Sequence, residues 1–201
     1  MLRFRTRRNR ALSQLIDSLP HPVTVLDVGG TPFFWESIDA LHKCRVTILN
    51  KQVSEKERVY FEPGKLKDFE LRIGDACAMP EIPTASFDLV VCNSVLEHVG
   101  AWGKMMDAAH ELVRVGKHGW VQVPAFEFPL EVHHLIPFVH WFGTPIRRAV
   151  VGLFYPGTLD EMRAWVDINL VTSKEMRALF PEAKVTSERF ALLPKSHIAV
   201  W

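Results

Sequence analysis

The sequence predicts a single α/β domain, residues 1–201, built around a doubly wound and mostly parallel sheet of seven strands. Apolar, strand-like runs alternate with helical stretches, and such alternation indicates right-handed βαβ units with helices on both faces of a sheet. The composition is that of an ordinary globular protein, with 48% hydrophobic and 23% charged residues. A chain of 201 residues is short for two enzymatic domains, so we expect one.

The N-terminal region, residues 1–22, is predicted to be a basic helix. Apolar residues recur at helical spacing from Ala11 to Leu19, and Pro20 and Pro22 end the pattern. Val23–Val28 is a continuous apolar and β-branched run, which is typical of a strand buried on both faces. The next elements expected are a helix at Phe33–His42, strands at Arg45–Leu49 and Leu71–Ile73, and between them a polar segment, 51–68, that is an exposed helix or a loop.

The second half continues the alternation until one long interruption. The elements predicted there are strands at Phe87–Cys92 and Gly119–Val123, a helix at Trp102–Val115, and final strands at Val185–Ser187 and Ala191–Val200. Residues 124–170 are aromatic and rich in Pro and His without a clear period, so we expect an insertion that covers a pocket as a substrate lid. Thr172 and Glu175 form a capping-box pattern that predicts a helix at Thr172–Phe180.

Composition excludes several classes of protein. A net charge of +1 argues against a nucleic-acid binder, whose affinity would come from many clustered basic residues. The one basic cluster is Arg3, Arg5, Arg7, Arg8 and Arg10, which we interpret as a solvated helix face, with transient contact to an anionic membrane as the alternative. Cys44, Cys77 and Cys92 lack zinc-site spacing and are expected to be reduced thiols, and no apolar run is long enough to span a bilayer. The expected location is cytoplasmic.

In an open parallel sheet, ligands bind outside the carboxyl ends of the strands. Four such turns carry suitable side chains: Asp27–Thr31, Asn50, Gly74–Ala76 and Asn93–His98. Glycines let the backbone approach a ligand closely. Asn50 follows the first turn by about twenty residues, the position from which a dinucleotide fold contacts ribose hydroxyls. Asp75 is placed to accept from an adenine amino group, and His98 supplies an imidazole, a side chain whose ordinary pKa lies near neutrality.

At these turns the sequence is similar to a known family. The segments VLDVGG, VTILN, IGDACAMP and FDLVVCNSVLEHV, in that order and spacing, resemble the small-molecule branch of the class I S-adenosylmethionine-dependent methyltransferases, often called type 11. The resemblance covers roughly residues 23–123. The ending FPEAKVTSERFALLPKSHIAV resembles the closing strand pair of this Rossmann-like fold, in which one strand is antiparallel.

The resemblance implies S-adenosylmethionine as cofactor and assigns residues to its parts. Asp27, Gly29 and Gly30 would line the methionine and ribose, and Asn50 the ribose hydroxyls. The turn of Gly74, Asp75 and Ala76 would hold the adenine, and Asn93 and Ser94 the sulfonium end. Thr31 and Phe33 stand where the family usually continues its alternating glycines, and Asn50 where an acidic residue is more usual.

The insertion PAFEFPLEVHHLIPFVHWFG resembles a segment of some type 11 members, in which a Pro-x-Glu-x-x-His pattern precedes an aromatic run. The substrate-binding residues expected there are Glu131, His133, Phe138 and Trp141. A metal site made from Glu131, His133, His134 and His140 is conceivable, but the spacing matches no closed motif, so no metal is expected.

Methyl transfer needs the acceptor held in line with the methyl group, and positioning alone can supply ~7–11 kcal/mol. A general base helps only when the acceptor has a proton to lose. His98 and His134 are the candidate catalytic bases, which predicts O-methylation of a small, partly hydrophobic acceptor; the alternative for His98 is a structural role near the following helix.

Two other functions compete with this prediction. A nicotinamide-dependent oxidoreductase would need a Gly-x-Gly-x-x-Gly turn, which is absent, and Pro32 and Phe33 would crowd a pyrophosphate. A non-catalytic member would keep the fold as a binding or partner protein, in keeping with the altered glycine turn.

Overall fold

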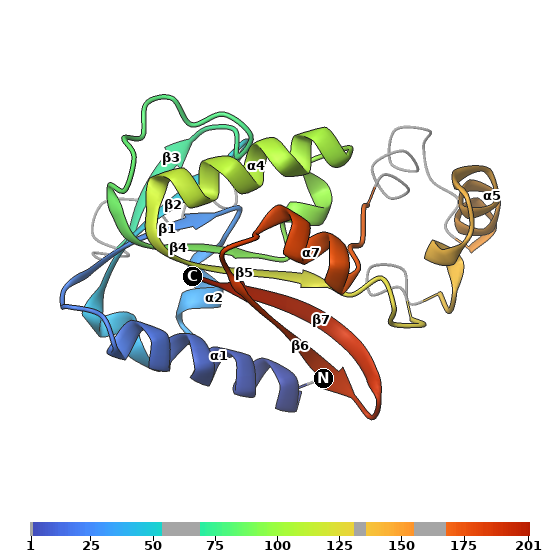
Figure 1. Cartoon of the computed structure of the whole chain (residues 1–201), viewed down its shortest axis with the longest axis horizontal. Helices are drawn as coiled ribbons and strands as arrows, with labels where there is room; N and C mark the ends of the chain where they lie inside the picture. The colour runs from blue at the N-terminus through green and yellow to red at the C-terminus, as the bar shows by residue number, and fades with distance from the viewer. Residues whose placement is uncertain (1, 54–68, 131–135, 155–167) are drawn as a thin grey trace.

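The structure, a computed structural model, describes residues 2–53, 69–130, 136–154 and 168–201, and their strands form one seven-stranded sheet (Figure 1). The strand order is β3-β2-β1-β4-β5-β7-β6. All neighbouring strands are parallel except that β7 runs antiparallel to both β5 and β6. The predicted fold class, with its single antiparallel strand, is confirmed. The strands are β1 (Val23–Val28), β2 (Cys44–Asn50), β3 (Phe69–Ile73), β4 (Phe87–Asn93), β5 (Gly116–Pro124), β6 (Lys184–Phe190) and β7 (Leu193–Val200).

Helices cover both faces of the sheet, and each face buries its own apolar cluster. On one face, α4 (Trp102–Val115) and α7 (Ser173–Leu179) pack with Leu112 and Met176 against the sheet residues Val90 and Val121. On the other face, α1 (Leu2–Asp17) and α2 (Pro32–Trp35) lie against the sheet (Figure 1). The central strands are therefore apolar on both sides, which explains the continuous hydrophobic run of β1.

The predicted helix at 33–42 is wrong in part, because the structure divides it. The chain forms the short helix α2, an extended residue at Ile38, and then the 3-10 helix η1 (Asp39–Lys43). The hydroxyl of Ser37 donates to the carbonyl of Phe34 at 2.6 Å. A short polar side chain that bonds to nearby backbone in this way competes with helix continuation.

Two strand boundaries differ from the predictions, whereas the N-terminal helix, Leu2–Asp17, lies within the predicted 1–22. Strand β5 begins at Gly116, three residues before the predicted Gly119. The last strand begins at Leu193, later than predicted, because Ala191 adopts a positive φ of 52° in the hairpin that joins β6 to β7.

After β5 the chain leaves the sheet and enters residues 124–170, the segment predicted to be an insertion. Its described elements are the 3-10 helix η4 (Val139–Trp141) and α5 (Thr144–Phe154), which lies beyond the end of β5 (Figure 1). A further 3-10 helix, η3 (Leu96–His98), follows β4. Within the described residues, no helix combines the length and apolar character needed to cross a membrane.

The capping box predicted for α7 is present. The hydroxyl of Thr172 accepts from the backbone N–H of Glu175 at 3.2 Å, and the carboxylate of Glu175 accepts from the backbone N–H of Thr172 at 2.7 Å. Two backbone donors at the start of α7 are thereby satisfied.

Replacing this cap should destabilise the fold measurably. We expect Thr172→Ala to lower the free energy of unfolding by about 1 kcal/mol, because an N-cap hydroxyl is lost. Thr31→Ala is the matched control, since Thr31 is the N-cap of α2 but its side chain makes no capping bond. Urea denaturation should show a change within about 0.5 kcal/mol for that control. Equal losses in the two variants would contradict the capping role.

Candidate cofactor and acceptor site

The first turn, after β1, depends on two glycines. Gly29 has a φ of 76°, in the left-handed region that favours glycine, and a Cβ there would lie 2.5 Å from a methyl group of Val95. A Cβ on Gly30 would lie 1.6 Å from Oδ2 of Asp27. The backbone N–H of Gly29 donates to the carbonyl of Leu49 at 2.8 Å, which ties the turn to β2. Neither glycine position therefore tolerates a side chain.

Asp27 lies fully buried beneath this turn. Its Oδ2 accepts from the indole N–H of Trp35 at 2.6 Å, while its Oδ1 has no hydrogen-bond partner among the described residues. Burial raises the pKa of Asp27 to about 7, against the opposing effect of the Trp35 bond. Near neutral pH this carboxyl can therefore hold or release a proton, and its second oxygen can accept from a ligand.

The turns after β2 and β3 are hydrogen-bonded to the first turn and to each other. The side-chain amide of Asn50 donates to the carbonyl of Gly30 at 3.1 Å. The backbone N–H of Gly74 donates to the carbonyl of Asn50, also at 3.1 Å. Three of the predicted cofactor turns are thus brought together at one edge of the sheet.

Asp75 is held in place as a carboxylate. Its Oδ1 accepts from the backbone N–H of Cys77 and its Oδ2 from Nζ of Lys51, both at 2.9 Å. Both hydrogen bonds lower the pKa of Asp75, and the bond from the Cys77 backbone has the larger effect. The neighbouring Ala76 is half-buried against the core.

The turn after β4 completes the group. Ser94 has a φ of 57°, and its hydroxyl donates to Oε1 of Gln122 at 3.0 Å while its backbone N–H donates to the Gln122 carbonyl at 2.8 Å. The Oδ1 atom of Asn93 is buried without a hydrogen-bond partner in the described part of the chain. Because Val95 packs against Gly29, the fourth turn adjoins the first.

Two residues that support this turn were missed from the sequence. Gln122, near the end of β5, is 2% exposed, and its Oε1 also accepts from the guanidinium of Arg8. The interpretation of the basic cluster as a solvated helix face is therefore wrong for Arg8, which is half-buried under β5. Burial lowers the pKa of the Arg8 guanidinium. The one feature of the sequence that could have indicated this contact is Gln122, a single polar residue inside the apolar run of β5.

His98 lies in η3 at the same edge of the sheet, with 42% of its side chain exposed. Its Nε2 atom is 3.9 Å from Oε1 of the fully buried Glu97. The Glu97 carbonyl accepts from the backbone N–H of Asn169 at 2.9 Å, and the Asn169 amide donates to the Gly100 carbonyl at 2.8 Å. The segment that returns from the insertion is thus joined to the loop that carries His98.

The described part of the insertion presents aromatic side chains. Phe138 and Trp141 are each 47% exposed, with ring centroids 5.0 Å apart. The indole N–H of Trp141 donates to the carbonyl of Phe126 at 2.9 Å, and Nε2 of the buried His140 lies 3.0 Å from the same oxygen. Three predicted site residues, Glu131, His133 and His134, lie outside the described residues. Among those that are described, no group of His, Cys, Asp or Glu side chains is arranged to hold a metal.

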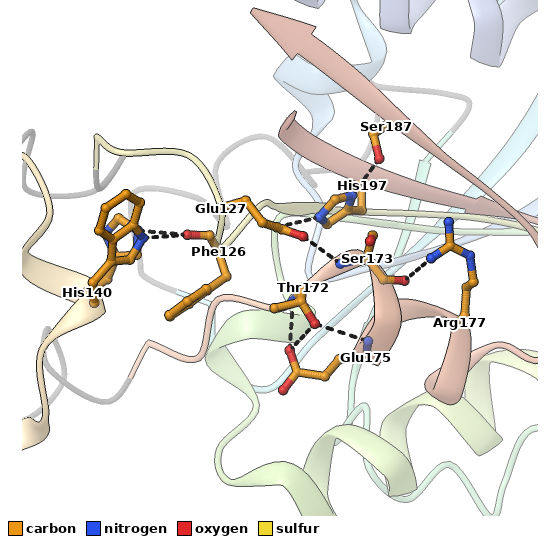
Figure 2. Close-up of polar contacts among 10 residues, drawn as sticks. Phe126, Glu127, His140, Thr172, Ser173, Glu175, Arg177, Ser187 and His197 are labelled. Atoms are coloured by element: carbon orange, nitrogen blue, oxygen red, sulfur yellow. Dashed lines mark hydrogen bonds and ion pairs between the residues drawn. The ribbon is translucent and has the colours of Figure 1, made fainter. Parts of the chain in front are cut away.

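A partly buried chain of hydrogen-bonded polar side chains anchors the start of the insertion (Figure 2). Nε2 of His197 lies 2.9 Å from Oε2 of Glu127, and its Nδ1 lies 2.9 Å from the hydroxyl of Ser187. The other Glu127 oxygen accepts from the backbone N–H of Ser173 at 3.1 Å. Burial acts to raise the pKa of Glu127, but these hydrogen bonds outweigh it and the net shift is downward. Neither Glu127 nor His197 was predicted, because their pairing joins segments about seventy residues apart.

Several solved structures have a similar fold. The carbon methyltransferase CurJ matches with a TM-score of 0.62 and 12% identity, over 98% of this chain and 53% of that one. The N-methyltransferase NodS from Bradyrhizobium japonicum, in complex with S-adenosylhomocysteine, matches with a TM-score of 0.59 and 14% identity, over 98% of this chain and 85% of that one. The chain thus spans about half the length of CurJ.

A third solved structure has a similar fold but is named as a different kind of enzyme. A protein from Rhodobacter sphaeroides, named provisionally as a zinc-dependent alcohol dehydrogenase, matches with a TM-score of 0.64 and 15% identity, over 96% of this chain and 87% of that one. At such identities likeness shows the fold alone, and one fold serves many chemistries. A search of curated proteins finds no match.

The fold, with its four converging turns, is that of the class I S-adenosylmethionine-dependent methyltransferases. The family model described as a methyltransferase domain matches residues 26–121, the stretch that holds all four turns. The resemblance noted in the sequence is confirmed, and S-adenosylmethionine is the cofactor of this class.

The buried carboxyl of Asp27 makes stability depend on pH. Its folded-state pKa of about 7 lies above the unfolded value of about 3.9, so between these values the folded protein holds a proton that the unfolded chain has released. Stability should therefore fall as the pH rises from about 4 to about 7, by up to about 1.4 kcal/mol per pH unit from this group. The Asp27→Asn variant should lack this pH-dependent contribution to the free energy of unfolding.

Urea denaturation of both proteins at several pH values measures the difference. The wild-type free energy of unfolding should decline relative to that of Asp27→Asn across this range. Parallel pH profiles would show that Asp27 is ionised in the folded state.

Proposed function

We propose that the protein transfers the methyl group of S-adenosylmethionine to an oxygen atom of a small, partly hydrophobic acceptor. The observation that supports this best is the convergence of four polar turns on one edge of the sheet, joined by the contacts of Gly30 with Asn50 and of Gly29 with Val95. Ligands of open α/β sheets bind at such an edge.

The residues present fit the cofactor. The backbone at Gly29 and Gly30 carries no side chain, and substitution at either is opposed by neighbouring atoms. Asp27 and Asn93 each present a buried oxygen that has no hydrogen-bond partner within the described segments. In our proposal Asp27, Gly29 and Gly30 hold the methionine and ribose, Asn50 the ribose hydroxyls, and Asn93 and Ser94 the sulfonium end. The turn of Gly74, Asp75 and Ala76 takes the adenine.

The cofactor supplies an electrophilic methyl group, and the protein supplies position and proton transfer. Positioning of the two reactants is the larger contribution to such a reaction. We assign the removal of the acceptor's proton to His98, which is partly exposed on η3 beside the turn that follows β4. The buried carboxylate of Glu97 would favour the protonated imidazole once the proton has moved. His134 is the second candidate base and belongs to the lid.

The acceptor is proposed to lie under the insertion 124–170. Exposed aromatic side chains at Phe138 and Trp141 favour a partly apolar substrate, with Glu131 and His133 as further contacts. The solved relatives named above include a carbon and a nitrogen methyltransferase, so the preference for oxygen rests on the candidate base. A non-catalytic binding protein with this fold is the alternative.

Location and membrane contact remain predictions. All three cysteines are free, in keeping with the cytoplasmic location that we expect. Arg5, Arg7 and Arg10 are exposed on α1, whereas Arg8 is turned toward Gln122. Transient contact with an anionic membrane would therefore use the first three, and co-sedimentation with anionic vesicles would measure it.

Cofactor binding should depend on Asp75. We expect purified protein to bind S-adenosylhomocysteine with micromolar affinity in calorimetric titration, and Asp75→Ala to weaken it at least about tenfold, since a hydrogen-bonded carboxylate is lost. Asp107→Ala is the matched control, because Asp107 also pairs with a lysine, Lys104, but lies exposed on α4. The same titration with NAD should show no heat. Absence of adenosyl-ligand binding in the wild type would favour the non-catalytic alternative.

Turnover should depend on His98. With methyl-labelled cofactor and a panel of phenols, catechols and hydroxy acids, we expect His98→Gln to lower kcat by ~10²–10⁴-fold on whichever acceptor is used, without loss of cofactor affinity. His110→Gln, an exposed histidine on α4, should leave kcat unchanged. Full turnover by His98→Gln would show that His98 is not the general base and would leave His134 as the candidate.

A further inference from the structure

A cavity of about 470 Å³ lies between α1 and the strands β6 and β7, and we call it the α1–β6 cavity. Its walls include Arg7, Arg8, Trp120, Arg189, Ile198 and Val200. None of the residues assigned to the cofactor lines it. Figure 1 shows α1 running beneath the sheet toward β6 and β7. Its volume falls within the range of small-molecule sites, about 300–1,000 Å³.

The cavity carries an excess of positive charge. Three arginines line it against one acid, Glu188, and the carboxylate of Glu188 already accepts from the hydroxyl of Ser196. Arg8 is the most enclosed of the three arginines; its guanidinium already donates to Gln122 and is attracted by Glu188, so the unbalanced positive charge lies on Arg7 and Arg189. Arg7 and Arg189 are exposed and free to turn toward a bound group. The charge therefore favours an anionic ligand.

The remaining wall is apolar. Ala11, Trp120, Ile198 and Val200 contribute to it, and Trp120 and Ile198 are only 5% and 6% exposed. The indole N–H of Trp120 is buried without a hydrogen-bond partner among the described residues.

We propose that the α1–β6 cavity binds a small amphipathic anion, with a carboxylate or phosphate group against the arginines and an apolar body over Trp120 and Ile198. An inorganic anion would leave the apolar wall without contacts, and a neutral apolar molecule would leave two of the three arginine charges unbalanced by Glu188. This ligand site is separate from the cofactor turns, and its occupancy requires no methyl transfer.

Calorimetric titration with monomeric octyl phosphate, without cofactor, tests the proposal. We expect saturable 1:1 binding, at least about tenfold tighter than that of octanol or of inorganic phosphate. The double variant Arg7→Gln/Arg189→Gln should weaken it at least about tenfold. Ala11→Trp fills the cavity from α1 and should abolish the binding of octyl phosphate. Far-UV circular dichroism and the urea midpoint should show that this variant still folds.

The matched control is Arg10→Gln/Arg45→Gln, which removes the same charge from exposed positions that do not line the cavity. Its affinity for octyl phosphate should stay within about twofold of the wild type, because distant exposed charges are screened. An equal loss in both double variants would show long-range attraction only and overturn the proposal. So would equal binding of inorganic phosphate or octanol, or binding to phosphatidylglycerol vesicles without binding of the monomer.

Discussion

The close approach of Gly30 to the buried carboxyl of Asp27 is the contact on which the cofactor edge of this protein depends. A strand that enters the core with a carboxyl at its end must satisfy that group, and here the indole of Trp35 does so for one oxygen. The backbone then crosses directly over the carboxyl, which only glycine permits. The same glycine offers its carbonyl to Asn50, so the first two turns become one unit.

Packing against Gly29 extends this unit to the other side of the sheet. Val95 occupies the space that a side chain at position 29 would need, so the turn after β4 packs directly against the turn after β1. Ser94, held in a left-handed conformation, is fixed in turn by two contacts with Gln122. The four turns are therefore joined to one another by packing and by hydrogen bonds among backbone and neutral side chains. Such preorganised contacts suit a reaction that depends on position.

The antiparallel strand β7 links the cofactor half of the sheet to the rest of the molecule. His197 joins it to Glu127 at the start of the insertion and to Ser187 on β6. Ser196 beside it bonds to Glu188 near the arginines of α1. One strand thus contacts the start of the insertion through His197 and the cationic cavity through Ser196 and Glu188, because successive side chains of a strand point to opposite faces.

The sequence by itself determined the α/β class, the seven strands, the order of the turns and the capping box of α7, because these follow from local periodicity and from residues a few positions apart. It also placed Asp27, Gly29, Gly30, Asn50 and Asp75 at strand ends, where the structure brings them together. Only the tertiary structure decided that Arg8 turns inward to Gln122, that Glu127 pairs with His197, and that the helix after Gly30 is divided. Those features arise from contacts between segments distant in sequence, whose burial and hydrogen bonding no local pattern encodes.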